Sequence, residues 1–136
     1  MVRALKTLRA VQWSMLASIL ICAMLGVVVV PARRLVDPAL SYLFSTLAVA
    51  IVGIIFVVRR TLVLRAAESL AAHPDDSLSL HQWRTGYLAT YALCEMLALF
   101  GVVLHFLGCY FEQSALFYAG GFVLLLFFGP RLPAAR

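Results

Sequence analysis

A single carboxylic acid, Glu95, stands in the middle of the apolar stretch "TYALCEMLALFG", residues 90–101. Apolar surroundings favour the neutral form of a carboxylic acid, and that form both donates and accepts a hydrogen bond. Two kinds of chemistry follow from this. Glu95 could bind and release a proton or a cation, or it could serve as a hydrogen-bonding contact between helices.

Side chains about one helical turn from Glu95 are the first candidates to act with it. Tyr91 precedes Glu95 by four residues and could donate a hydrogen bond to the carboxyl group. We therefore predict Glu95 and Tyr91 as the candidate proton- or cation-binding residues. Ser45 and Thr46, midway along another apolar run, are further candidate partners from across a bundle.

Small side chains share one face of the same segment, beside Glu95. At about 100° per residue they form a stripe, and small residues let two membrane helices approach closely. We predict this stripe as a helix-contact face. Its residues are Thr90, Cys94, Ala98 and Gly101.

The rest of the chain offers no pattern typical of catalysis. His105 lies ten residues after Glu95, roughly 15 Å along a helix, so the two side chains cannot touch. A packing role is expected for His105, with a water-linked relay to Glu95 as the alternative. The sequence has no C-x-x-C pair, Ser/His/Asp arrangement, phosphate-binding loop or H-E-x-x-H motif. We expect no enzymatic activity, no metal site and no cofactor.

The composition predicts a membrane protein. Of the 136 residues, 64% are hydrophobic and 12% are charged, whereas soluble domains carry roughly 25% charged residues. The net charge of +5 comes from basic residues at the ends of apolar runs. Basic residues there indicate topology, so we expect the lipid bilayer as a partner and no nucleic acid.

Four apolar segments approach the roughly 20 residues that cross a bilayer. They cover residues 11–30, 39–58, 86–108 and 112–129. The first is expected to be retained, since it is too long for a signal peptide and no A-x-A-like site follows. Residues 59–85 are predicted to be a cytoplasmic helical extension and loop. The expected fold is one all-α domain, residues 1–136, of four transmembrane helices.

Local signals mark several helix ends. Asp37 followed by Pro38 predicts the start of the second helix, because Asp accepts from free N–H groups and proline lacks one. Ser114 is predicted to cap the fourth helix, and Gly129-Pro130 to end it.

The distribution of Lys and Arg predicts the orientation. Arg33 and Arg34 lie on one side of the four predicted spans, whereas nine basic residues lie on the other. The expected protein has both termini in the cytoplasm and sits in a bacterial inner (plasma) membrane. Trp13, Trp83 and Tyr87 fall near the predicted cytoplasmic interface, where amphipathic rings prefer to lie. The nine are Arg3, Lys6, Arg9, Arg59, Arg60, Arg65, Arg84, Arg131 and Arg136.

The segments "AAESLAAHP" and "RTGYLATYALCEMLALFGVVLHFLG" together resemble the second half of a hairpin of the rotary ATP synthase subunit c family. In that family a cytoplasmic polar loop with a proline leads into a helix with an ion-binding carboxylate midway. The resemblance covers about residues 40–108 and is that of a divergent relative, not of a rotor subunit. It implies that Glu95 is the proton- or sodium-binding carboxylate.

Two hypotheses about function remain open. The chain is a small accessory or oligomer-forming membrane subunit that uses Glu95 in helix association, or it translocates a proton or cation through Glu95. Both predict a homo-oligomer or a larger membrane complex.

Overall fold

The computed structural model describes residues 2–29, 37–73 and 75–130. This part of the chain is helical nearly throughout and contains no strand, which confirms the all-α prediction for it. The elements are α1 (Val2–Val28), α2 (Pro38–Val58), the π-helix η1 (Arg59–Leu64), α3 (Arg65–Ala72), α4 (Ser77–Phe106) and α5 (Phe111–Phe127).

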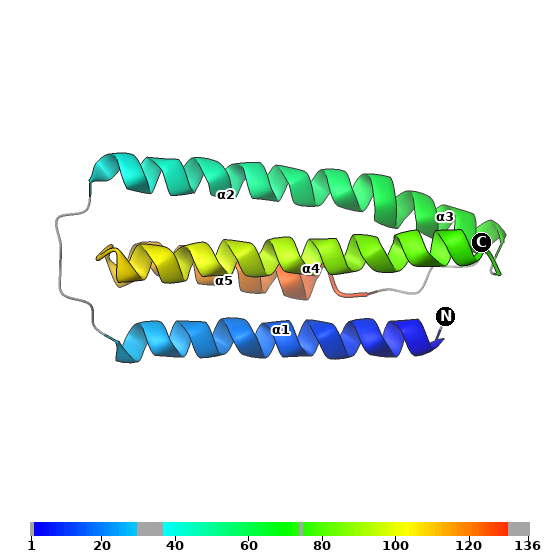
Figure 1. Cartoon of the computed structure of the whole chain (residues 1–136), viewed down its shortest axis with the longest axis horizontal. Coiled ribbons are helices and arrows are strands. Elements are labelled where there is room, and N and C mark those ends of the chain that lie inside the picture. Colours follow the sequence, from blue (N-terminus) through cyan, green and yellow to red (C-terminus); the bar gives the residue numbers. More distant parts are fainter. Residues whose placement is uncertain (1, 30–36, 74, 131–136) are drawn as a thin grey trace.

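The helix α4 is the centre of the bundle and packs against every other element. In Figure 1, α1 and α4 run in one direction, and α2 and α5 run in the other. The helix α2 continues through η1 into α3, and α3 packs against α4 near the start of α4. The helix α5 lies against α4 and ends part of the way along it (Figure 1).

Short-range signals set the ends of α2 and α4. Asp37 caps α2 by accepting a hydrogen bond from the Ala39 N–H at 3.0 Å, and Pro38 is the first helical residue, as predicted. Asp76 caps α4 in the same way through the Leu78 N–H. At the other end of α4, Gly108 adopts a φ of 98°, a left-handed conformation that glycine adopts without strain.

The predicted cap at Ser114 is wrong. The helix α5 begins three residues earlier, at Phe111, and Tyr110 precedes it without a side-chain cap bond. Ser114 is therefore inside the helix and fully buried, with its carbonyl oxygen against Gly101. The reason is that the turn at Gly108 lets the chain re-enter a helix almost at once, so the first turn of α5 forms before Ser114 is reached.

The outer surface of the bundle is largely apolar. Large hydrophobic side chains such as Trp13, Val49, Phe56, Leu116 and Val123 are exposed. Soluble monomers rarely present so much contiguous apolar surface. Three helical segments in the described residues are long and apolar enough to cross a membrane, namely Val2–Val28, Pro38–Ala72 and Ser77–Phe106. The fourth helix, α5, has 17 residues.

Trp83 and Tyr87 were predicted to lie at the depth of the cytoplasmic interface, and the structure shows that their rings point into the bundle. Both side chains are buried in the bundle, with ring centroids 5.0 Å apart in a T-shaped contact. The cause is the packing of α3 and η1 against the first half of α4. Only Trp13 of the three predicted interfacial rings is exposed.

Candidate functional site

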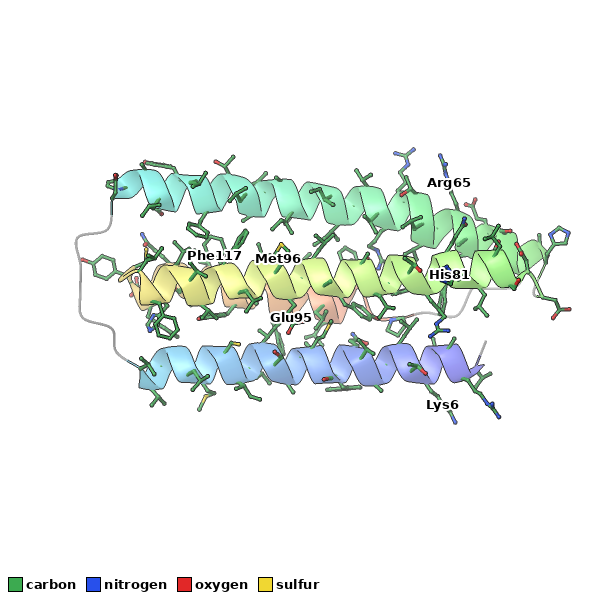
Figure 2. All side chains as sticks on the ribbon, in the orientation of Figure 1. Lys6, Arg65, His81, Glu95, Met96 and Phe117 are labelled. Carbon is green, nitrogen blue, oxygen red and sulfur yellow. The ribbon has the colours of Figure 1, made fainter. Side chains whose placement is uncertain are left out.

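Glu95 lies near the midpoint of the apolar part of α4, on the side of that helix nearest α1 (Figure 2). Its side chain is half-buried. Met96, the next residue, projects on the opposite side of α4 (Figure 2). Within the described part of the chain, the Glu95 carboxyl group takes part in no hydrogen bond or ion pair. The carboxyl group is therefore half-buried and has no hydrogen-bonding partner among the residues that the structure describes.

The structure does not join Tyr91 to Glu95. Tyr91 is fully buried, and its hydroxyl group has no hydrogen-bond partner among the described residues. Ser45 and Thr46 are exposed on α2, and the Thr46 hydroxyl donates to the Tyr42 carbonyl oxygen of its own helix. The residues proposed from the sequence as partners of Glu95 thus form no hydrogen bond with its carboxyl group.

The small-residue face of α4 meets α5 of the same chain. A Cβ atom added to Gly121 would lie 2.7 Å from the Cys94 carbonyl oxygen and 3.2 Å from the Ala98 Cβ. A Cβ atom added to Gly101 would lie 2.9 Å from the carbonyl oxygen of Ser114. The predicted contact residues Thr90, Cys94, Ala98 and Gly101 are all buried. This face is therefore occupied inside the bundle, and Glu95 lies outside it.

His105 joins α4 to the end of α1. Its Nε2 atom lies 2.9 Å from the Val29 carbonyl oxygen, and the side chain is buried. The hydroxyl group of Tyr118 approaches the same part of α1, 3.3 Å from where a Cβ of Gly26 would lie. These contacts fit the packing role expected of His105.

Arg59 has a structural position that the sequence did not predict. The sequence indicated only a role in topology, but Arg59 is the first residue of η1 and its side chain is half-buried. Its guanidinium carbon lies 4.1 Å from the ring centroid of Phe128 and 5.5 Å from that of Tyr87. Such contacts attract a cation to the ring face. Arg59 thus links α2, α4 and the end of α5.

Gln12 is a second polar residue that sequence reasoning missed. Its Nε2 atom donates a hydrogen bond of 2.9 Å to the Leu125 carbonyl oxygen near the end of α5, and the side chain is buried. Carbonyl groups in the last turn of a helix lack intrahelical partners, so a buried donor there stabilises the end of the helix. Gln12 could have been singled out from the sequence, because it is an amide side chain within an otherwise apolar segment.

The described charges are distributed unequally between the two ends of the bundle. Every described Lys and Arg lies in the first turns of α1, in η1 and α3, or early in α4. These segments share one end, where Figure 2 shows Lys6 and Arg65. The described histidines, cysteines and carboxylates form no group that could hold a metal ion.

No protein-family model, curated protein or solved structure matches this chain. Its function is therefore argued from its own geometry. The distinctive feature of that geometry is a half-buried carboxyl group at the middle of an apolar helix, with no hydrogen-bond partner among the described residues.

Proposed function

We propose that this chain is an integral membrane protein that crosses a bacterial plasma membrane four times, with both termini in the cytoplasm. Three helices of sufficient length and an apolar outer surface support this. The gathering of basic residues at one end supports a cytoplasmic location for that end. The helix α5 is about 25 Å long at 1.5 Å per residue, so local thinning of the bilayer would let it span.

Within the membrane, the protein is a non-enzymatic subunit that associates with other helices through Glu95. The observation that carries this proposal is the absence of any hydrogen-bond partner for Glu95 among the described residues. An acidic side chain at the centre of a membrane helix costs roughly 2.5–3.5 kcal/mol on insertion scales. A helix from another subunit that supplies a hydrogen-bond partner would offset part of this cost.

The test compares Glu95→Gln with Glu95→Leu in mild detergent. The amide keeps a donor and an acceptor, so Glu95→Gln should leave the mass of the complex unchanged in light scattering. Glu95→Leu removes both and should weaken association by about 1 kcal/mol, roughly fivefold in the dissociation constant. Glu112→Leu serves as the control, because Glu112 is exposed in the first turn of α5. An unchanged complex in Glu95→Leu would contradict the proposal.

Translocation of a proton or cation is the second candidate function. The observation that favours it is the half-buried position of Glu95 midway along α4, where its carboxyl group is only partly enclosed by the bundle and could exchange a proton. The resemblance to subunit c implies the same role. In vesicles, Glu95→Gln should then abolish proton or sodium flux while association persists. Flux equal to that of the unmodified protein would rule this function out.

A further inference from the structure

Arg59 is a charged residue in a position that the pattern of α2 and η1 otherwise fills with apolar side chains. The residues Ile51, Ile55, Arg59 and Val63 follow one another in steps of four, and the three apolar members are buried in the bundle. Arg59 is half-buried, and its Nη1 atom is enclosed without a hydrogen-bond partner among the described residues. The guanidinium group therefore lies partly inside the bundle and is not solvated on all sides.

No acidic side chain neutralises the charge of Arg59. All six Asp and Glu residues of the chain lie in the described part, and none of them forms an ion pair with Arg59. The rings of Phe128 and Tyr87 attract the guanidinium group, with centroids 4.1 Å and 5.5 Å from its central carbon, but they bring no negative charge. A guanidinium group stays charged in proteins, and a partly buried charge is costly without a counter-charge. Arg59 therefore favours an anion as a partner, and the acidic side chains do not supply it.

The depth of Arg59 in a membrane matches that of lipid phosphate groups. The apolar residues 39–58 before it would cover about 30 Å at 1.5 Å per residue, which is the thickness of the hydrocarbon layer. Arg59 is thus the first residue beyond that layer, on the side where the described Lys and Arg residues gather.

The short helix α5 brings the phosphate groups closer to Arg59. Its 17 residues cover about 25 Å, and a bilayer thins locally around a span that is shorter than its hydrocarbon layer. Figure 1 shows that α5 ends part of the way along α4. Phe128 directly follows α5, and the guanidinium group of Arg59 lies over the Phe128 ring. Thinning at the end of α5 therefore moves the phosphate layer toward the level of Arg59.

A phosphate group suits the chemistry of this position. A planar guanidinium group donates two parallel hydrogen bonds to phosphate oxygens. Arg60, Arg65 and Arg84 are exposed at the same end of the bundle and raise the positive potential there. Basic positions between membrane helices on the cytoplasmic side bind acidic head groups for the same reason. An anionic phospholipid supplies a phosphate group at this depth without a positive charge of its own.

We propose that Arg59 binds the phosphate group of an anionic phospholipid where η1, α4 and the end of α5 meet. This inference rests on the proposed function, since it requires insertion in a membrane with Arg59 at the surface of the hydrocarbon layer. It adds a lipid ligand and the residue that binds it, and it does not involve Glu95.

Native mass spectrometry of the purified protein in mild detergent tests the site. With phosphatidylglycerol as the probe, Arg59→Met should weaken lipid binding about tenfold, as expected for the loss of a charge-assisted contact. Arg60→Met is the matched control, because it removes the same charge from the exposed neighbouring residue. It should weaken binding only about twofold, as expected for a charge that solvent screens. Equal losses in the two variants would overturn Arg59 as the lipid-binding residue.

A second variant, Arg59→Lys, separates the role of charge from that of the fold. Lysine keeps the positive charge and loses the planar fork, so binding should fall by about threefold and stay above that of Arg59→Met. Circular dichroism of each variant checks that the helices are retained. Equal binding by Arg59→Lys and Arg59→Met would contradict an electrostatic contact with a phosphate group.

Thermal unfolding in detergent identifies the source of the phosphate group. Phosphatidylglycerol at roughly ten times its dissociation constant should raise the midpoint of the unmodified chain by about 5 °C. Inorganic phosphate at the same concentration should not, because it has no acyl chains to hold it beside the helices. An equal rise with inorganic phosphate would reassign the site to a free anion, and an equal rise with phosphatidylcholine would overturn the preference for an anionic lipid. No rise with any of the three would overturn the site.

The outcomes separate this inference from the proposed function, because lipid binding is measured at Arg59 in η1 and association at Glu95 in α4. If Glu95→Leu leaves the complex unchanged while Arg59→Met loses the lipid, the proposed association fails and the lipid site stands. If Arg59→Met and Arg60→Met bind the lipid equally while Glu95→Leu weakens association, the lipid site fails and the proposed function stands.

Discussion

Gly120 and Gly121 are adjacent in α5, yet they have different surroundings. A Cβ on Gly121 would collide with the backbone of α4 at Cys94, whereas a Cβ on Gly120 would meet only the end of the Leu97 side chain, at 3.6 Å. The backbone of α5 can therefore approach α4 this closely only because residue 121 lacks a side chain.

Gly121→Ala is expected to destabilise the bundle by about 1–3 kcal/mol, the usual effect of overpacking a tight contact. Gly120→Ala is the matched control and should be neutral or slightly stabilising, because alanine favours helix over glycine by up to about 1 kcal/mol. Unfolding of the purified protein by SDS titration measures both. Equal stability of the two variants would show that the contact at Gly121 is not tight.

Arg59 and Phe128 are expected to stabilise each other. A double-mutant cycle with Arg59→Met and Phe128→Leu should give a coupling free energy of about 0.5–2 kcal/mol, as for a cation held over an aromatic ring. Arg60, the exposed neighbour of Arg59, serves as the control through Arg60→Met combined with Phe128→Leu. Thermal unfolding in detergent supplies the four stabilities of each cycle, and zero coupling between Arg59 and Phe128 would contradict the stabilising contact.

Individual helices begin and end where short-range hydrogen bonds allow it. Asp76 illustrates this at the start of α4, where its carboxylate accepts from the Ser79 hydroxyl at 2.5 Å and from the Leu78 N–H at 3.1 Å. The Ser79 hydrogen bond, aided by the backbone bonds, holds the pKa of Asp76 below its ordinary value of 3.8. Because the pKa is lower in the folded state, this carboxylate stabilises the fold above the ordinary pKa, and the stabilisation is lost as the pH falls through the lower folded-state value.

Asp76→Ala should therefore lower the stability of the protein near pH 6, and its difference from the unmodified chain should shrink as the pH falls below about 4. Thermal unfolding in detergent at several pH values measures this difference. Asp75→Ala is the control, because Asp75 takes part in no hydrogen bond among the described residues. A difference between Asp76→Ala and the unmodified chain that stays constant down to pH 3 would contradict the role of the carboxylate as a cap.

For the molecule as a whole, the two ends of the bundle differ in charge. The described Arg and Lys residues gather at the end where α1 begins and where α3 meets α4, whereas α2 and α5 begin at the opposite end. This asymmetry is the physical basis of the proposed orientation, because basic segments near the ends of spans are retained on the cytoplasmic side.

The orientation predicts which end an impermeant thiol reagent can reach. In a background without the native cysteines, Glu112→Cys at the start of α5 should be labelled from outside intact cells. Glu68→Cys in α3 should be labelled only after the cells are opened. Both positions are exposed in the bundle, so burial does not explain a difference between them. The reverse pattern would contradict the proposed orientation.

The sequence alone determined the features that depend on neighbouring residues or on composition. The all-α class follows from long apolar runs without helix-breaking residues, and the start of α2 follows from Asp37 and Pro38, whose effect is confined to one turn. The sequence also singled out Glu95, since an acid in an apolar run is visible without a structure. It could not predict the π-helix η1, against which Gly86 packs so closely that a Cβ would lie 2.7 Å from Val63.

Only the tertiary structure decided what each side of α4 touches. Tyr91 and Glu95 are close in sequence, but Tyr91 is fully buried in the core, whereas Glu95 is half-buried on the side of α4 nearest α1. The same packing placed Arg59 over Phe128 and buried Trp83. These contacts join residues far apart in the chain, and helical periodicity specifies the direction of a side chain without specifying which helix lies in that direction.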